Sequence, residues 1–420
     1  MASYIINGPA RNFGGSVEIS GSKNSALPIM AAAMLSRDKS TLHNLPRLSD
    51  TKTMAEIMTS LGCSVARQPG GTVIISADIN SPRRKCGYEL FSRLRASVLI
   101  MAPLLARFGR AKIPLPGGCK IGARPIDLHL KGFAAMGAKI KQGHGFVDVS
   151  AKGGLKGSRI YLDFPSVGAT ENLMIAACLA DGTTTILNAA NEPEICDLAE
   201  FLNGMGAFVM GAGSDTIVID GAHELHGCEH RIIPDRIEAG TFLVFAAGLG
   251  AALRVEKAEP RHLKPLLAKL SEMGFDCEAG SDFIDLRSAG RPRAVDIKTL
   301  PYPGFPTDLQ AQAVALLATS DGSGMVVETI FENRFTHIPE LCRMGAGIKT
   351  EGNAAFIKGV RSLSGAEVNA TDLRAGAALV AAALKANGKS VIHNIEHIER
   401  GYENFTEKLK SLGVEIETTE

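Results

Sequence analysis

The sequence lacks the features that several classes of protein require. Its 45 Lys and Arg residues nearly balance 44 Asp and Glu, and a net charge of +1 gives no reason to expect a polyanionic partner such as DNA. The N-terminal residues contain no basic segment followed by an apolar run, so no signal peptide is expected. The longest apolar stretch, residues 241–253, is too short and too rich in glycine to span a bilayer. We therefore expect a cytoplasmic protein without nucleic-acid or membrane partners.

Two nucleotide-binding motifs and one cysteine motif are also missing. There is no Gly-x-x-x-x-Gly-Lys-Ser/Thr run, and no Gly-x-Gly-x-x-Gly that follows a strand and opens a helix. An ordinary nucleotide-binding fold is therefore not supported. The eight cysteines are dispersed without a Cys-x-x-Cys pair, which indicates free thiols in a reducing compartment.

The sequence does contain one pattern that is repeated six times. In each copy a helical stretch ends in Leu or Met, followed by Gly, a small or apolar residue and a strand. These glycines lie 68–75 residues apart and are Gly62, Gly137, Gly206, Gly274, Gly345 and Gly413. Self-similarity at a nearly fixed spacing indicates one supersecondary unit copied along the chain. A glycine in this place stops a helix at its C′ position.

Each repeat contains two helices of different character. The first is rich in alanine and apolar on nearly all sides, so we expect it to be buried; these helices are residues 25–35, 96–106, 171–180, 239–249, 309–318 and 373–384. The second helix is amphipathic, as at 197–205 and 263–273, and a hairpin such as 208–210 with 217–219 follows it. The pattern predicts an α/β fold of six βαβαββ-type repeats with buried helices and outer sheets.

The sixth repeat is incomplete, because its strand at 414–416 has no return strand after it. Residues 4–6 and 16–19 read as spare strands near the N-terminus. We therefore expect the two ends of the chain to meet and to close the last repeat. An open solenoid is the alternative, but solenoid ends usually need polar caps, and none is evident.

Several buried helices begin with charged residues that local rules do not favour. The residues are Lys23-Asn24, Arg93 and Arg95, Asp235-Arg236, and Asp372 with Arg374. The N-terminus of a helix carries about half a positive charge, so a cation there is disfavoured by a few tenths of a kcal/mol to about 1 kcal/mol. Several equivalent cases indicate that these helix ends converge on a bound anion, such as a phosphate-bearing ligand.

One glycine-rich loop, residues 115–129, contains the cysteine best suited to chemistry. Cys119 is next to Lys120 and near Arg124, and cationic neighbours lower the pKa of a thiol. The glycines of the loop suit it to act as a lid. Another candidate, the His-rich segment 223–230, lacks the spacing of a metal site and is interpreted as a solvated loop.

Taken together, the motifs resemble those of the enolpyruvyl transferases that act on UDP-N-acetylglucosamine. They are present in order as Lys23-Asn24, Pro116-Gly117-Gly118-Cys119, and residues 122–129, 166–170, 234–236, 305–308, 331–335, 371–374 and 400–403. The resemblance implies transfer of the enolpyruvyl group of phosphoenolpyruvate to the 3-hydroxyl of UDP-N-acetylglucosamine, with release of phosphate. That reaction is the first committed step of peptidoglycan synthesis and the target of fosfomycin. No metal and no cofactor is implied.

The resemblance also implies a two-domain inside-out α/β barrel with three repeats in each domain. One domain is residues 22–233, which carry the cysteine lid loop 115–125. The other combines residues 1–21 with 234–420 and carries Asp308, Arg374 and Arg400. Two alternatives stay open: a transferase similar to 5-enolpyruvylshikimate-3-phosphate synthase, and a non-catalytic repeat scaffold.

Roles follow from the resemblance residue by residue. Cys119 is implied to donate a proton to phosphoenolpyruvate or to form an adduct with it, and Asp308 to accept the proton of the attacking hydroxyl or to orient it. Lys23, Arg124 and Arg400 are implied to hold the phosphate and carboxylate of phosphoenolpyruvate and to stabilise developing charge, with support from Asp372 and Arg374. The residues implied to bind the UDP-sugar are Asn24, Arg95, Arg124, Pro125, Ile126, Asp127, Leu128, Ser166, Val167, Gly168, Asp308 and Ile330.

Overall fold

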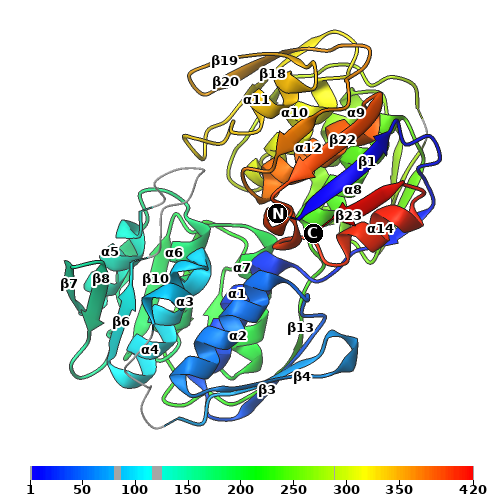
Figure 1. Ribbon diagram of the computed structural model, residues 1–420. Helices are drawn as coiled ribbons and strands as arrows, with labels where there is room; N and C mark the ends of the chain where they lie inside the picture. The colour runs from blue at the N-terminus through cyan, green and yellow to red at the C-terminus, as the bar shows by residue number, and fades with distance from the viewer. Residues whose placement is uncertain (1, 80–86, 116–124, 288, 420) are drawn as a thin grey trace. The chain divides into compact units, whose positions relative to one another are not determined.

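The structure is a computed structural model that describes residues 2–79, 87–115, 125–287 and 289–419 (Figure 1). The described residues form two compact units. The first unit lies within residues 21–233, and the second unit combines residues 2–20 with 234–419. Each unit has its own apolar core. None of the described helices combines the length and apolarity needed to cross a membrane.

The first unit contains three buried helices, three sheets and the amphipathic helices that connect their strands. The buried helices are α1 (Lys23–Ala32) with η1 (Ala33–Leu35), η3 (Arg95–Ile100) with α4 (Met101–Phe108), and α6 (Val167–Ala177). The other helices are α2 (Ser49–Leu61), α3 (Tyr88–Ser92), α5 (Asp127–Ala135) and α7 (Pro193–Gly204). The strand orders are β13-β3-β5-β4, β6-β8-β7 and β11-β12-β10-β9. The strands are β3 (Lys39–His43), β4 (Ser64–Arg67), β5 (Val73–Ser76), β6 (Arg110–Pro114), β7 (Lys139–Gly143), β8 (Phe146–Ser150), β9 (Arg159–Tyr161), β10 (Thr183–Leu187), β11 (Phe208–Met210), β12 (Thr216–Asp220) and β13 (Glu229–Arg231).

The second unit repeats this plan. Its buried helices are α8 (Arg236–Leu249), α10 (Gln310–Leu317) and α12 (Leu373–Lys385), and its other helices are α9 (Lys264–Glu272), α11 (Ile338–Arg343), α13 (Glu396–Glu399) and α14 (Phe405–Ser411). The strand orders are β21-β22-β1-β23, β15-β16-β14-β2 and β17-β18-β20-β19. The strands are β1 (Ser3–Gly8), β2 (Ser16–Glu18), β14 (Leu253–Glu256), β15 (Cys277–Ala279), β16 (Phe283–Leu286), β17 (Ile297–Lys298), β18 (Ser323–Val327), β19 (Gly347–Glu351), β20 (Ala354–Lys358), β21 (Glu367–Asn369), β22 (Gly388–His393) and β23 (Ile416–Thr419).

The predicted repeat is confirmed in its helices and its hairpins. In the third repeat β9 and β10 are parallel, because the buried helix α6 crosses between them, and β11 and β12 form the antiparallel hairpin. All six alanine-rich helices are present and largely buried. The described strands form six separate open sheets, in agreement with the expected α/β fold of repeats with buried helices.

The two ends of the chain meet as expected. Strand β1 lies between β22 and β23 and is antiparallel to both, with Ile6 opposite Ser390 on one side and Ile416 on the other (Figure 1). The expectation that residues 16–19 also complete the last repeat is wrong, because β2 instead pairs in parallel with β14. The interpretation of residues 223–230 as a solvated loop is also wrong in part, because β13 pairs in parallel with β3. In both cases the first strand of a repeat comes from a distant part of the chain.

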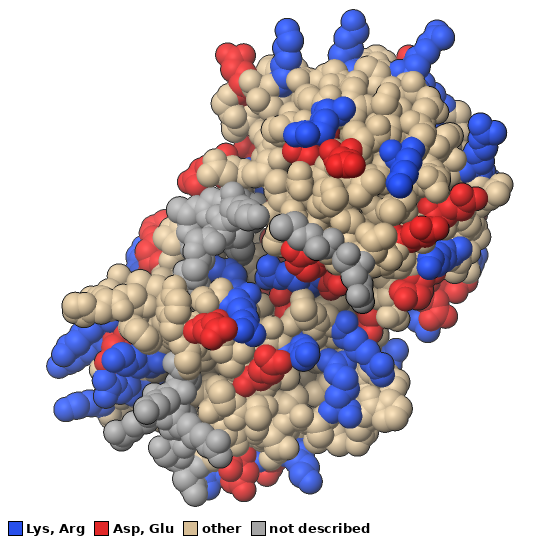
Figure 2. All heavy atoms as spheres, in the orientation of Figure 1, with Lys and Arg blue, Asp and Glu red and all other residues tan. Residues whose placement is uncertain are grey.

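Charged side chains of both signs are interspersed on the face shown in Figure 2, in agreement with the net charge of +1. No large region of this face carries one sign alone. The distribution gives no support for binding of an extended polyanion through this face.

The six repeat glycines end their helices in the left-handed conformation, as predicted. Their φ angles lie between 84° and 109°. At Gly62 the amide donates to the Thr59 carbonyl at 3.0 Å, and the next amide, of Cys63, donates to the Met58 carbonyl at 3.1 Å. These bonds satisfy carbonyl groups that the helix leaves without partners.

Replacing two of these glycines should separate the cost of the backbone conformation from the cost of a clash. A Cβ at Gly345 would meet nothing within 4 Å, so Gly345→Ala should lower the free energy of unfolding by about 1–2 kcal/mol, the cost of a left-handed L-residue. A Cβ at Gly413 would lie 2.4 Å from the Asn12 carbonyl oxygen, so Gly413→Ala should cost more. Urea denaturation of both variants measures this, and equal losses would contradict the geometry.

Glu171 is a carboxyl group inside the first unit, on helix α6, and only 5% exposed. Burial, with the nearby charges of Glu194 and Glu192, raises the pKa of Glu171 well above its ordinary value. The folded state therefore holds this proton more tightly than the unfolded state does. Its contribution to stability is complete below the unfolded-state pKa of about 4.3 and is lost as the pH rises above it.

Glu171→Gln should therefore change the pH dependence of stability. The neutral amide should make the variant more stable than the parent at pH 7–8, and the difference should shrink towards pH 4. Denaturant unfolding at a series of pH values measures the effect, with the exposed Glu200→Gln as the control for loss of a carboxylate. A stability difference that does not vary with pH would show that Glu171 is not held protonated.

Candidate functional site

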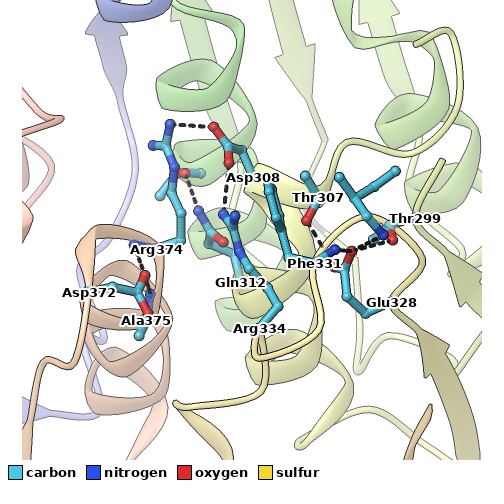
Figure 3. Close-up of polar contacts among 12 residues, drawn as sticks. Thr299, Thr307, Asp308, Gln312, Glu328, Phe331, Arg334, Asp372, Arg374 and Ala375 are labelled. Atoms are coloured by element: carbon cyan, nitrogen blue, oxygen red, sulfur yellow. Dashed lines mark hydrogen bonds and ion pairs between the residues drawn. The ribbon is translucent and has the colours of Figure 1, made fainter. Parts of the chain in front are cut away.

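Asp308 lies between two guanidinium groups in the second unit (Figure 3). It belongs to the short turn η5 (Thr307–Leu309) that leads into α10. Its Oδ1 accepts a hydrogen bond from Nη2 of Arg334 at 2.7 Å, and its Oδ2 accepts one from Nη2 of Arg374 at 2.9 Å. The arginine side chains are 4% and 5% exposed and the carboxylate is 26% exposed. The carboxylate is therefore the member of the cluster that solvent or a ligand can reach.

Arg374 remains a cation although it is buried at the start of helix α12. Burial alone would lower its pKa, but Asp308, Tyr402 and Asp235 together more than offset this, so the pKa of Arg374 is raised. Asp372 caps the same helix, since its Oδ1 accepts from the amides of Arg374 at 2.9 Å and Ala375 at 3.1 Å. The unfavourable cation at a helix N-terminus is thus balanced by two carboxylates.

A buried polar network joins the three central helices of this unit. The Tyr402 hydroxyl accepts from Nη1 of Arg374 at 3.4 Å and lies 3.0 Å from the Thr241 hydroxyl of α8. Gln312 of α10 donates to the Thr241 hydroxyl at 3.0 Å and to the Tyr402 hydroxyl at 3.3 Å. Thr241, Gln312 and Arg374 all lie in the N-terminal halves of their helices. The starts of α8, α10 and α12 therefore contact one another through this network, while the convergence of helix starts on a bound anion stays a prediction.

Lys23 is the first residue of α1 in the first unit. Its ammonium group forms an ion pair of 3.5 Å with Asp50, and the two side chains are 12% and 8% exposed. Asn24 follows in the same helical turn, and Ser22 caps the helix by accepting from the Ser25 amide at 3.3 Å. Arg95, a half-buried residue, begins η3. Both predicted cations therefore stand where a helical segment begins.

The starts of α5 and α6 are brought together in the first unit. Ser166 caps α6, whose first turn contains Val167 and Gly168, and a Cβ on Gly168 would lie 3.5 Å from the His129 ring of α5. Asn172 contacts Nδ1 of His129 at 2.9 Å and donates to the Val98 carbonyl of η3 at 3.1 Å. The predicted segments 126–128 and 166–168 therefore lie next to each other. Helix η3, which begins at Arg95, contacts α6 through the Val98 carbonyl.

The other predicted site residues differ in their exposure, and two of them are not among the described residues. Cys119 and Arg124 lie outside the described residues. Pro125 and Asp127 are exposed, whereas Ile126 is buried and Leu128 half-buried. Arg400, half-buried, follows α13, and Ile330 donates its amide to the Glu328 carboxylate at 2.8 Å.

Sequence reasoning missed Arg334 and the two polar residues Gln312 and Thr241 as members of the site. Arg334 lies inside the quoted motif 331–335, which was the available signal, but its contact with Asp308 spans 26 residues. Burial also lowers the pKa of nearby His337 to about 4, so this residue is neutral at physiological pH.

The His-rich segment 223–230 does contribute one buried contact. Nε2 of His230, on β13, lies 2.8 Å from Oδ1 of Asp197, and the Ser25 hydroxyl donates to Oδ2 of the same carboxylate. This contact links β13 to α7 and α1. Over the described residues, no group of three or more His, Cys, Asp or Glu side chains could hold a metal ion.

The chain is similar to proteins of known activity over nearly its whole length. A family model described as EPSP synthase (3-phosphoshikimate 1-carboxyvinyltransferase) matches residues 8–409. UDP-N-acetylglucosamine 1-carboxyvinyltransferase 2 of Carboxydothermus hydrogenoformans is 55% identical over 419 residues, with 99% of each chain covered. UDP-N-acetylglucosamine 1-carboxyvinyltransferase 1 of Caldanaerobacter subterraneus subsp. tengcongensis is 54% identical over 402 residues, with 96% of each covered.

Solved structures agree with these matches. The enolpyruvyl transferase NikO from Streptomyces tendae has a TM-score of 0.90 at 26% identity and covers all of this chain and 99% of its own. An EPSP synthase from Acinetobacter baumannii has a TM-score of 0.78 at 18% identity with full coverage of both chains, which shows the shared fold. With a family model that matches residues 8–409 and relatives more than half identical over at least 96% of the sequence, the chain belongs to the EPSP synthase family of enolpyruvyl transferases.

Proposed function

We propose that this chain transfers the enolpyruvyl group of phosphoenolpyruvate to the 3-hydroxyl of UDP-N-acetylglucosamine and releases phosphate, the first committed step of peptidoglycan synthesis. The observation that carries the proposal is the Asp308 carboxylate, held by Arg334 and Arg374 in a chain 55% identical to a UDP-N-acetylglucosamine 1-carboxyvinyltransferase. The free thiols of the described cysteines support a reducing, cytoplasmic location for this reaction.

Asp308 is proposed to receive or orient the acceptor hydroxyl. An ionised carboxylate has about four lone-pair sites, and Arg334 and Arg374 occupy one on each oxygen. The Asp308 side chain is 26% exposed, so a sugar hydroxyl can reach the carboxylate and donate to it. The two arginines fix the carboxylate, so that it does not have to be reoriented when the hydroxyl arrives.

The reaction itself is proposed to be an addition followed by an elimination. The sugar hydroxyl oxygen bonds to C2 of phosphoenolpyruvate as Asp308 takes its proton, and the Cys119 thiol gives a proton to the methylene carbon C3. The resulting methyl group then returns a proton to the Cys119 thiolate as the bond between C2 and the phosphate oxygen breaks. Asp308 gives its proton to the leaving phosphate, so that phosphate is released and the double bond is restored. Lys23, Arg124 and Arg400 are proposed to hold the phosphate and carboxylate throughout.

Binding of the UDP-sugar is proposed to use Asn24, Arg95, residues 124–128 and residues 166–168 of the first unit, most of them at helix starts. In the second unit it is proposed to use Asp308 and Ile330. Amides at the start of a helix point towards a bound anion, so these turns suit the diphosphate. Asp372 and Arg374 are proposed to support the carboxylate that faces the sugar.

One phosphate-release assay tests the proposal and its nearest alternative. The protein should release phosphate from phosphoenolpyruvate with UDP-N-acetylglucosamine and not with shikimate 3-phosphate; the opposite preference would overturn the assignment. Cys119→Ala should reduce turnover about 10²–10⁴-fold, the usual contribution of a general acid. It should also abolish alkylation by the epoxide fosfomycin, and alkylation that persists in this variant would exclude Cys119 as the target.

Asp308→Asn should reduce both activity and stability. Turnover should fall by about 10²-fold or more, because an amide cannot take the proton. The free energy of unfolding should fall by about 1.5–3 kcal/mol, because two buried guanidinium groups lose their charged acceptor. The matched control is Asp148→Asn, which removes the acceptor of exposed Arg110 at 2.6 Å and should cost less than about 1 kcal/mol. Equal stability losses in the two variants would contradict the special role of the buried arginines.

A further inference from the structure

Four of the six repeats follow one rule at the residue that comes directly after their first hairpin-pairing strand. In four repeats this residue has a left-handed backbone: Asn44 after β3 (φ 57°), Asn188 after β10 (φ 54°), Lys257 after β14 (φ 53°) and Asn394 after β22 (φ 59°). Asparagine tolerates this conformation better than most residues do. The repeat therefore has a default geometry at this position, and asparagine is its usual residue.

The default side chain is a hydrogen-bond donor. Nδ2 of Asn44 donates to the Ile232 carbonyl at 2.9 Å, and Nδ2 of Asn188 donates to the Leu162 carbonyl at 2.7 Å. Both carbonyls lie directly after the neighbouring parallel strand, β13 in one case and β9 in the other. The amide thus ties together the ends of the two parallel strands.

Two repeats depart from this rule: the second, in which Leu115 follows β6, and the fifth. Glu328 follows β18, and its φ angle lies outside the left-handed region. Glu328 is 3% exposed, and its carboxylate is an acceptor, whereas Asn44 and Asn188 place a donor at this position. The neighbouring strand β17 is followed by Thr299, whose hydroxyl donates to Oε1 of Glu328 at 2.9 Å (Figure 3).

The Glu328 carboxylate accepts three further hydrogen bonds, and all come from segments that lead to the Asp308 cluster. Oε1 accepts from the amides of Ile330 at 2.8 Å and Phe331 at 3.2 Å, and Oε2 accepts from the Thr307 hydroxyl at 2.9 Å (Figure 3). Thr307 directly precedes Asp308, and the turn that begins at Ile330 continues to Arg334. One buried carboxylate therefore contacts the segments on both sides of the Asp308–Arg334 ion pair, through the Thr307 hydroxyl on one side and two backbone amides on the other.

Four donors at one place require an acceptor with several lone pairs, such as an ionised carboxylate. An asparagine amide has a single acceptor oxygen, and in the default geometry it acts as a donor. Glu328 breaks the local rule of its repeat, and its contacts lead to the segments that carry Asp308 and Arg334, which points to a functional demand. We propose that Glu328 is a positioning residue of the enolpyruvyl transfer reaction, which holds Asp308 and Arg334 in the arrangement that receives the acceptor sugar. This inference rests on the proposed function.

The test restores the default residue of the repeat. Glu328→Asn should fold, but it should lower kcat about 10–100-fold, because small displacements of a catalytic group are that costly. It should also raise the dissociation constant of UDP-N-acetylglucosamine in calorimetry, since Ile330 loses its anchor. Glu328→Gln keeps an oxygen for Thr299, Ile330 and Phe331 and should recover most of both parameters.

A control variant separates positioning from general stability. Lys257→Asn introduces the default residue at the equivalent position of the fourth repeat, where Lys257 forms an exposed ion pair with Glu18. It should leave kcat and KM unchanged. If Glu328→Asn had wild-type kcat and KM, or if Glu328→Gln were no better than Glu328→Asn, the inference would be overturned, because a merely structural role would lower only the melting temperature.

A crystal structure of Glu328→Asn makes this test independent of the proposed function. The Asp308–Arg334 contact, 2.7 Å in the parent, should be lengthened or lost in the variant. If the parent released no phosphate from either acceptor, the proposed function would fail, and the structure would still decide whether Glu328 positions the pair. An unchanged contact in the variant would overturn the inference whatever the activity.

Discussion

The candidate site depends on keeping two arginine side chains charged inside the second unit. Arg334 and Arg374 are almost fully buried, and a buried cation is strongly unfavourable unless a carboxylate and further hydrogen bonds compensate for lost water. Asp308 supplies the charge for both, and Tyr402 supplies a hydroxyl to Arg374. The same contacts leave the carboxylate as the accessible member of the cluster. The same arrangement therefore compensates the charges of the two arginines and leaves the Asp308 carboxylate accessible to a ligand hydroxyl.

The repeated architecture explains how one chain can be regular in its core and specialised at its helix starts. Buried alanine-rich helices and their glycine stops meet the same packing requirement in every repeat, so they vary little. The residues that directly follow the first hairpin-pairing strands differ more, from asparagine in three repeats to Lys257, Leu115 and Glu328 in the others. Glu328 takes the place of a default asparagine, and Asp308 opens a helix whose equivalents begin with other residues. Departures from the repeat are accordingly found near the candidate site.

The sequence predicted the local elements well and the long-range pairings only in part. Helices, hairpins and the six glycine stops follow from hydrophobic periodicity and from backbone sterics, which neighbouring residues decide. The return of β1 to the last repeat was predictable because that repeat lacked a strand. The destinations of β2 and β13 were not, because strands of three residues have too little pattern to specify a partner. The site residues came from long motifs, but the role of Arg334 needed the fold.

What the sequence determined by itself is the repeat, its buried helices and the charged residues at their starts, since these depend on spacing along the chain. Membership of a family is readable in the same way, from motifs that keep their order. The tertiary structure alone decided that Asp308 meets Arg334 and Arg374, and that Glu328 anchors the turns on both sides. Such contacts join residues 20 to 70 positions apart through single hydrogen bonds, which leave no periodic trace in a sequence.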